Sequence, residues 1–177
     1  MVDAILDPTG GTRVKAASAV LTPQRVRLAG ATIGLLENTK QNAALFLEEL
    51  GKLLRERHGV ATTVARTKTN FAMPVSAELM RELADACDAV ITGVGDCGSC
   101  SASAVADGVA FERQGIPAAV ICSDAFTVTA DAMAELREAK GYRYAKTAHP
   151  VAVLTPEEIR KRAEEALPAV VEILTGS

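Results

Sequence analysis

Two cysteines near the middle of the chain have the type and the spacing for thiol chemistry. Cys97 and Cys100 enclose Gly98 and Ser99 in a Cys-Gly-Ser-Cys motif. Thiols at this spacing can close to a disulfide and reopen, and the first of them is activated when it lies at the start of a helix. We therefore expect Cys97 to be the attacking thiolate and Cys100 to be the thiol that resolves an adduct formed at Cys97.

The residues around this motif are typical of an open loop where a buried strand turns into a helix. Gly95 and Gly98 allow a tight bend and leave room for a ligand. Ser99 and Ser101 are expected to contact the substrate. Asp96, directly before the motif, is expected either to cap the following helix or to accept a proton.

Further candidates lie on other loops of the chain. His149 precedes Pro150 and is a candidate general acid or base. Lys40 and Asn42 are candidates for binding an anionic group or for orienting a carbonyl of the substrate. Phe126 completes the predicted substrate contacts.

Other roles for the cysteines stay open at this point. Free cysteine often packs as a small apolar residue, and Cys87 and Cys122 are expected to do so. A metal site is a second alternative, with four candidate ligands: Cys97, Cys100, Cys122 and His149. No second Cys-x-x-Cys or His-x-His pair accompanies them. The motif loop would also suit a lyase, hydratase or isomerase without a redox step, or a subunit that binds a partner.

The apolar pattern alternates between short runs typical of strands and amphipathic helical segments. Five strands are predicted, the last of them weak: 26–36, 60–67, 88–94, 116–122 and 144–148. Helices are predicted between Ala43 and a stop at Gly59, after a cap at Ser76, over 101–114, over 129–140, and from Thr155 onward. This alternation predicts an α/β three-layer sandwich with a mainly parallel four- or five-stranded sheet, flavodoxin- or Rossmann-like.

Such a sheet determines where the chemistry should be. Ligands bind beyond the carboxyl ends of parallel strands, so the loops 37–42, 95–101 and 123–127 are expected to gather around one site. Within the helix after the motif, Asp107 and Glu112 are expected to face solvent.

Length, charge and composition limit the class of protein. The chain has 177 residues, four cysteines and a formal net charge of −3. This length suits one core, so we expect a single α/β domain over 25–177 and an extended arm over 1–24. No basic patch points to nucleic acid, and no apolar stretch approaches the roughly 20 residues of a membrane helix.

These limits lead to a cytoplasmic protein that acts on a small-molecule substrate. No bound cofactor is expected, and an external thiol or a protein reductant would supply electrons. We expect the chain to form a homo-oligomer or to associate with a paralogous subunit, because its Ala-rich arm and aromatic-poor helices would bury well against another chain.

The motif and several other segments resemble the UGSC-motif family, which is named for a Sec-Gly-Ser-Cys or Cys-Gly-Ser-Cys signature. The likeness covers most of the chain and rests on these segments: Cys97-Gly98-Ser99-Cys100, Asp7-Pro8-Thr9-Gly10, Asn38-Thr39-Lys40-Gln41-Asn42-Ala43, Cys87-Asp88-Ala89-Val90, Glu112-Arg113-Gln114-Gly115-Ile116-Pro117 and His149-Pro150. The stretch from Asp88 to Cys122 is also similar to the selenocysteine-bearing region of the selenoprotein B-type subunits of glycine and proline reductases.

The resemblance implies a role for each cysteine of the motif. In those reductases the selenol attacks the substrate and cleaves a carbon–heteroatom bond reductively, so Cys97 would be the attacking atom in the place of selenocysteine. The chain departs from the reductase subunits after the motif, where it has Ser101 and Ser103 and no third cysteine. The resemblance therefore implies related thiol chemistry and does not imply an identical reaction.

Overall fold

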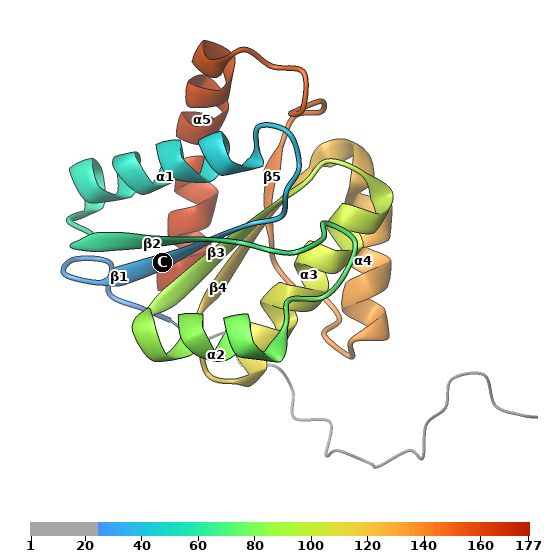
Figure 1. The fold of residues 1–177 in the computed structure, drawn as a ribbon, viewed down its shortest axis with the longest axis horizontal. Helices are drawn as coiled ribbons and strands as arrows, with labels where there is room; N and C mark the ends of the chain where they lie inside the picture. Colours follow the sequence, from blue (N-terminus) through green and yellow to red (C-terminus); the bar gives the residue numbers. More distant parts are fainter. Residues whose placement is uncertain (1–24) are drawn as a thin grey trace, which may run out of the picture.

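The computed structural model describes residues 25–177, so the arm predicted over 1–24 lies outside the described residues. The described residues form five strands in one sheet (Figure 1): β1 Thr32–Glu37, β2 Thr62–Thr67, β3 Ala89–Gly95, β4 Ala118–Ser123 and β5 Ala145–Thr147. Their order is β2-β1-β3-β4-β5, and every neighbouring pair is parallel. This is the flavodoxin-like strand order, and it confirms the predicted α/β sandwich with a parallel sheet.

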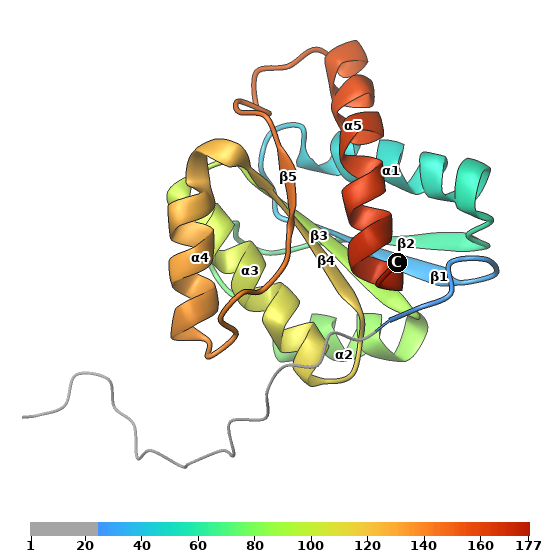
Figure 2. The same cartoon turned by 180° about the vertical axis from the view of Figure 1, so that it is seen from behind.

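Helices cover both faces of the sheet and make the outer layers (Figures 1 and 2). One face carries α1 (Ala43–His58) and α5 (Pro156–Thr175), which pack against each other. The other face carries α2 (Ala77–Ala86), α3 (Gly98–Arg113) and α4 (Thr127–Leu136), with a short 3-10 turn, η1 (Asp124–Phe126), before α4. An aliphatic core fills each side.

Two interior strands of the sheet, β3 and β4, are buried along their whole length. Their sequences, AVITGVG and AAVICS, are nearly continuous runs of apolar and small residues, which is typical of parallel strands covered by helices on both faces. The motif follows β3 directly, so it is attached to a strand that is buried along its whole length.

Local signals explain most helix starts. The Ser76 side chain accepts a hydrogen bond from the backbone N–H of Leu79 at the start of α2. Thr155 and Glu158 form a capping box at the start of α5, and Pro156 is the first helical residue. The cap at Ser76 and the helix start at Thr155 were predicted from the sequence and are confirmed.

Several boundaries differ from the prediction; α4, for example, spans Thr127–Leu136 and not 129–140. The first strand begins at Thr32 and not at Val26, because the chain turns at Gly30, whose φ of +84° favours glycine. Helix α3 begins at Gly98 and not at Ser101, because Cys97 itself caps it. Between residues 25 and 177, no helix is both long and apolar enough to cross a membrane.

Candidate functional site

The Cys-Gly-Ser-Cys motif forms the turn from β3 into α3, at the carboxyl edge of the sheet. Cys97 has extended backbone and is the N-cap of α3, and its Sγ accepts the backbone N–H of Cys100 at 3.3 Å. The two cysteines are joined in a disulfide with Cα atoms 5.3 Å apart, a separation that is ordinary for disulfides. Cys97 is half-buried, Cys100 is fully buried and Ser99 is exposed. An approaching molecule therefore reaches the pair at Cys97.

Asp96 and His149 form a pair directly beside the motif. His149 Nδ1 lies 2.9 Å from Asp96 Oδ1, and the Asp96 side chain is 5% exposed whereas that of His149 is 39% exposed. Because a carboxylate only accepts, Nδ1 carries the proton in this contact, and Nε2 is left to exchange a proton with a bound molecule. Asp96 thus orients the imidazole.

Asp96 does not cap α3, which was one of its two predicted roles. Its Oδ2 accepts the backbone N–H groups of Val151 and Ala152, at 2.9 and 3.0 Å, because the side chain turns away from α3 toward the loop after β5. Asp124, after β4, accepts the backbone N–H of His149. Three strand ends therefore meet around His149.

Asn42 holds the same loop from the other side. Its Nδ2 donates to the carbonyls of Val151, Ala152 and Leu154 at 2.9 to 3.2 Å. Both views show the connection from β1 to α1 passing close to the connection from β5 to α5 (Figures 1 and 2). The Asn42 amide nitrogen donates to three carbonyls of the protein, so Asn42 positions the His149 loop.

Lys40 and Phe126 lie at opposite sides of this loop cluster. The Lys40 ammonium lies 4.4 Å from the centre of the Phe71 ring. Within the described part of the chain, no ion pair joins Lys40 to a carboxylate. Phe126 packs edge to face against the His149 ring, with centroids 5.3 Å apart. The loops after β1 and β4 thus bring a cation and a ring to the edge where the motif lies.

The two glycines of the motif region have different surroundings. A Cβ on Gly95 would lie 2.7 Å from Ser101 Oγ and 2.8 Å from Cys122 Sγ, so this glycine lets α3 pack closely on β3 and β4. Ser101 is fully buried and faces Cys122 instead of a ligand. A Cβ on Gly98 would meet only Thr129, at 3.7 Å, so Gly98 has open space around it.

The prediction that Asp107 faces solvent is wrong. Asp107 is buried and forms an ion pair with Lys68, which is also buried, and Lys68 Nζ donates to Ser103 Oγ at 2.9 Å. Asp107 Oδ1 accepts the backbone N–H of Val75, and Ser103 Oγ donates to the Met73 carbonyl. This network fastens the β2–α2 loop to α3.

Glu112 is also buried, and its Oε1 accepts the backbone N–H of Ala118 at the start of β4. The sequence did contain a signal for both carboxylates. Helix α3 has apolar or small residues on every side, and such a helix is expected to be buried all round. A charged residue inside it therefore needs a partner from the protein.

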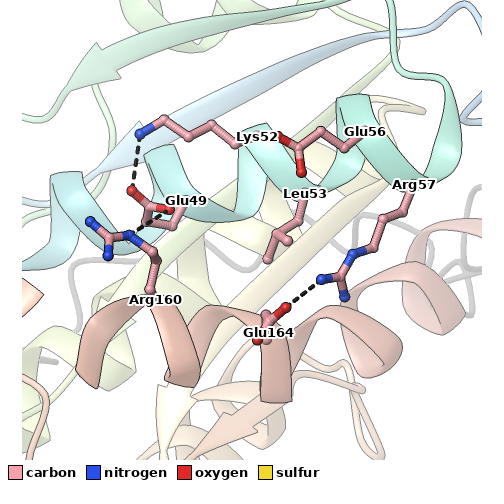
Figure 3. A pocket seen from close by; sticks show the side chains of 7 residues that line it. All are labelled: Glu49, Lys52, Leu53, Glu56, Arg57, Arg160 and Glu164. Atoms are coloured by element: carbon pink, nitrogen blue, oxygen red, sulfur yellow. Dashed lines mark hydrogen bonds and ion pairs between the residues drawn. The ribbon is translucent and has the colours of Figure 1, made fainter. Parts of the chain in front are cut away.

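A groove of about 310 Å³ lies between α1 and α5 (Figure 3). Seven residues line it: Glu49, Lys52, Leu53, Glu56, Arg57, Arg160 and Glu164. Its charges largely pair with one another, as in the contacts of Glu49 with Lys52 and Arg160 and of Glu164 with Arg57. It shares no residue with the cysteine site, and we assign no chemistry to it.

The metal alternative is not supported by the arrangement of the side chains. Among residues 25–177, no three residues of the types His, Cys, Asp and Glu come together as a metal site would require. Cys122 is buried below Gly95 and Cys87 is buried between α2 and the sheet, as expected for core cysteines.

The fold and the site together define an α/β protein with a flavodoxin-like sheet and a dithiol motif at the carboxyl edge of its third strand. Comparison with known families places it further: the chain belongs to the UGSC family, which matches residues 4–176. No curated protein matches the sequence.

Among solved structures, the chain is similar to a diflavin flavoprotein A3 from Nostoc sp. The two share 15% identity with a TM-score of 0.44, over 82% of this chain and 94% of the other. The likeness concerns the fold alone.

Proposed function

We propose that this chain is a thiol-dependent enzyme in which Cys97 attacks a small electrophilic substrate and the Cys97–Cys100 pair supplies the electrons for reductive cleavage. The position of Cys97 carries the proposal. Its sulfur caps α3, accepts the Cys100 N–H and is the accessible member of the pair. Helix N–H groups and the positive end of the helix dipole favour a thiolate over a thiol at such a position.

The proposed reaction balances with two thiols as the reductant. The Cys97 thiolate attacks the electrophilic carbon of R–X, forms a carbon–sulfur bond and expels X⁻. The Cys100 thiolate then attacks Cys97 Sγ, which forms the disulfide and releases the carbon with the electron pair of the broken bond. A proton completes R–H. The substrate gains two electrons, and the dithiol loses two electrons.

His149 is the proposed source of that proton. Asp96 holds Nδ1, so Nε2 gives the proton to the leaving carbon and regains one from solvent through its partly exposed side. The two backbone N–H groups that donate to Asp96 Oδ2 hold its carboxyl group in place next to the imidazole.

Lys40 is the proposed binding group for a negatively charged part of the substrate. Lys40 follows β1, and the connections after β1 and β3 lead to helices on opposite faces of the sheet. Its ammonium lies over the Phe71 ring and has no carboxylate partner among the described residues. Ligands of doubly wound sheets bind at this switch point. We therefore propose a small carboxylate, or a molecule of similar charge, with a leaving group near its charged end.

The proposal includes the compartment, the reductant and the association of the chain. The chain would act in the cytoplasm without a bound cofactor, and an external thiol or protein would return the disulfide to the dithiol. The likeness of Asp88–Cys122 to the selenoprotein B-type subunits supports reductive chemistry. Association with a copy or a paralogous subunit is part of the same proposal.

Chloroacetate tests the proposal, because it combines an anionic group with an electrophilic carbon. We expect the reduced protein to release acetate and chloride while the Cys97–Cys100 disulfide forms. In Cys100→Ser, a carboxymethyl adduct should accumulate on Cys97, as detected by intact mass and peptide mapping. Lys40→Met should slow adduct formation with chloroacetate and leave the rate with uncharged chloroacetamide unchanged.

Two results would contradict the proposal. A reduced protein whose Cys97 reacts no faster than free cysteine has no activated thiolate. A stable adduct on wild-type Cys97, with no disulfide and no acetate, would favour the non-redox alternative, in which Cys97 is a covalent or acid/base group of a lyase, hydratase or isomerase.

A further inference from the structure

The regular backbone pairing of β3 ends just before the motif begins. The register of β3 with β1 stops at Gly93, whose partner is Glu37. On the other side, the register of β3 with β4 is irregular between Thr92 and Gly95. Side-chain contacts can therefore decide where the turn between β3 and Cys97 lies.

Two buried side chains make such contacts, one from each neighbouring strand. Asn38, directly after β1, donates from Nδ2 to the Val94 carbonyl at 3.0 Å. Ser123, the last residue of β4, donates from Oγ to the Gly95 carbonyl at 3.1 Å. Their exposed fractions are 1% and 0%. Because β3 lies between β1 and β4, the backbone of two consecutive residues is anchored from both sides.

The burial of Asn38 is unfavourable for stability. Its Oδ1 is buried, and none of the described residues donates to it. The Val94 carbonyl also accepts the backbone N–H of Asp96, at 3.1 Å, so it would keep a partner without Asn38. A buried polar atom without a partner destabilises a fold, and a leucine of similar volume would avoid that loss. An amide at this position therefore points to a role other than stability.

We propose that Asn38 and Ser123 are positioning residues that hold the accessible sulfur of Cys97 at the N-terminus of α3. This inference rests on the proposed function, in which Cys97 is the attacking thiolate. Asp96 and Cys97 follow the anchored residues directly, so a shift of the backbone there moves the sulfur, and with it the carboxylate that orients His149. Helix N–H groups stabilise a thiolate only at close range, so a displaced sulfur would carry a proton up to a higher pH.

The pH dependence of Cys97 labelling in the reduced full chain tests the proposal, with iodoacetamide as the reagent and peptide mass spectrometry as the readout. We expect Asn38→Leu and Ser123→Ala each to raise the pH of half-maximal labelling rate by about one unit, so that labelling below this pH slows about tenfold. Asn38→Leu should keep or raise the midpoint of urea unfolding, because it removes the unpartnered oxygen. Its effect on Cys97 then cannot come from a less stable fold.

Thr92→Val is the matched control. Thr92 is buried in the middle of β3, and its Oγ1 donates to the Leu36 carbonyl of β1 at 3.2 Å. The variant removes one buried hydrogen bond between strands, as Ser123→Ala does, so both should lower the urea midpoint to a similar extent. Only Ser123→Ala should change the pH of half-maximal labelling rate, because only Ser123 anchors the turn.

Three results would overturn the proposal. An unchanged labelling profile in Asn38→Leu or in Ser123→Ala would exclude a positioning role for that residue. A lower urea midpoint in Asn38→Leu, or a variant that does not fold, would mean that the amide serves the fold. An equal shift in Thr92→Val would mean that any loosening of β3 affects Cys97.

The wild-type profile distinguishes this inference from the proposed function. If wild-type Cys97 is labelled with the pH dependence of free cysteine, the thiolate is not activated and the proposed function fails. If wild-type Cys97 is activated and the two variants match it, only the positioning role fails.

Discussion

Helix α3 contains two regions with opposite properties. In its first turn, Cys97 and Gly98 are half-buried and Ser99 is exposed. In the turns that follow, Ser101, Ser103 and Asp107 are buried. Both regions are rich in polar residues, but the first can meet a molecule from outside and the second can meet only the rest of the protein.

This difference distinguishes residues that could react from residues that stabilise the site. In the buried turns, Asp107 binds Lys68 and the β2–α2 loop, and Ser103 donates to the Met73 carbonyl. In the first turn, Cys97 Sγ accepts only one backbone N–H and can change its bonding partner. A buried polar residue of α3 thus holds the site in place, and an accessible one is the candidate for reaction.

The largest expected contrast is between the cysteines of the two regions. Burial raises the pKa of Cys122 from 9.0 to about 12, so its thiolate at pH 8 is about a thousand times scarcer than that of an ordinary thiol. Burial also raises the pKa of Cys87. In the reduced protein, iodoacetamide at pH 8 should label Cys97 at least a thousand times faster than Cys122, as followed by peptide mass spectrometry. Comparable labelling rates for Cys97 and Cys122 in the folded protein would show that the two regions of α3 do not differ in reactivity.

The next effect concerns the buried ion pair. Lys68→Met leaves Asp107 without its counter-charge and should lower the free energy of unfolding by about 3–5 kcal/mol at pH 8, measured by urea denaturation. Replacing both residues, as Lys68→Met with Asp107→Leu, should recover part of this loss. A single variant as stable as the wild type would show that the network does not hold the loop.

The pH dependence of Lys68→Met checks the cause. Burial raises the pKa of Asp107 even with the Lys68 ammonium beside it, so removing Lys68 must raise this pKa further. A carboxyl whose pKa is raised by folding binds its proton more tightly in the folded state. Stability therefore falls as the pH rises from the unfolded pKa through the folded one. The deficit of the variant should shrink as the pH is lowered from 8 toward 5.

The third prediction tests the boundary between the two regions. Gly95→Ala places a Cβ 2.8 Å from Cys122 Sγ and from Ser101 Cα, so β3 and α3 must separate, at a cost of about 1–3 kcal/mol in unfolding free energy. Gly98→Ala meets only Thr129, at 3.7 Å, and should fold normally. Equal losses in thermal or urea unfolding would mean that packing does not distinguish the two glycines.

Much of this arrangement could be predicted from the sequence. Periodicity and caps at Ser76 and Thr155 gave the helices, and the rule that ligands bind at carboxyl strand ends brought Cys97, His149 and Lys40 to one edge. The role of Asn42 as a clamp and the Lys68–Asp107 pair could not be predicted. Both depend on contacts between segments more than 35 residues apart, which no local pattern encodes.

The smallest expected effect concerns the cap of α3. A sulfur accepts hydrogen bonds weakly, whereas serine is among the best N-cap residues. Under reducing conditions, at a pH low enough for Cys97 to be a neutral thiol, Cys97→Ser should therefore raise the free energy of unfolding by up to about 1 kcal/mol, and it should remove all labelling at position 97. Ser76→Ala, at the cap of α2, should lower it by about 1 kcal/mol and leave Cys97 labelling unchanged. A loss of stability in Cys97→Ser would mean that the thiol is there for packing. A gain would mean that the first turn of α3 gives up stability to keep a sulfur where a substrate can reach it.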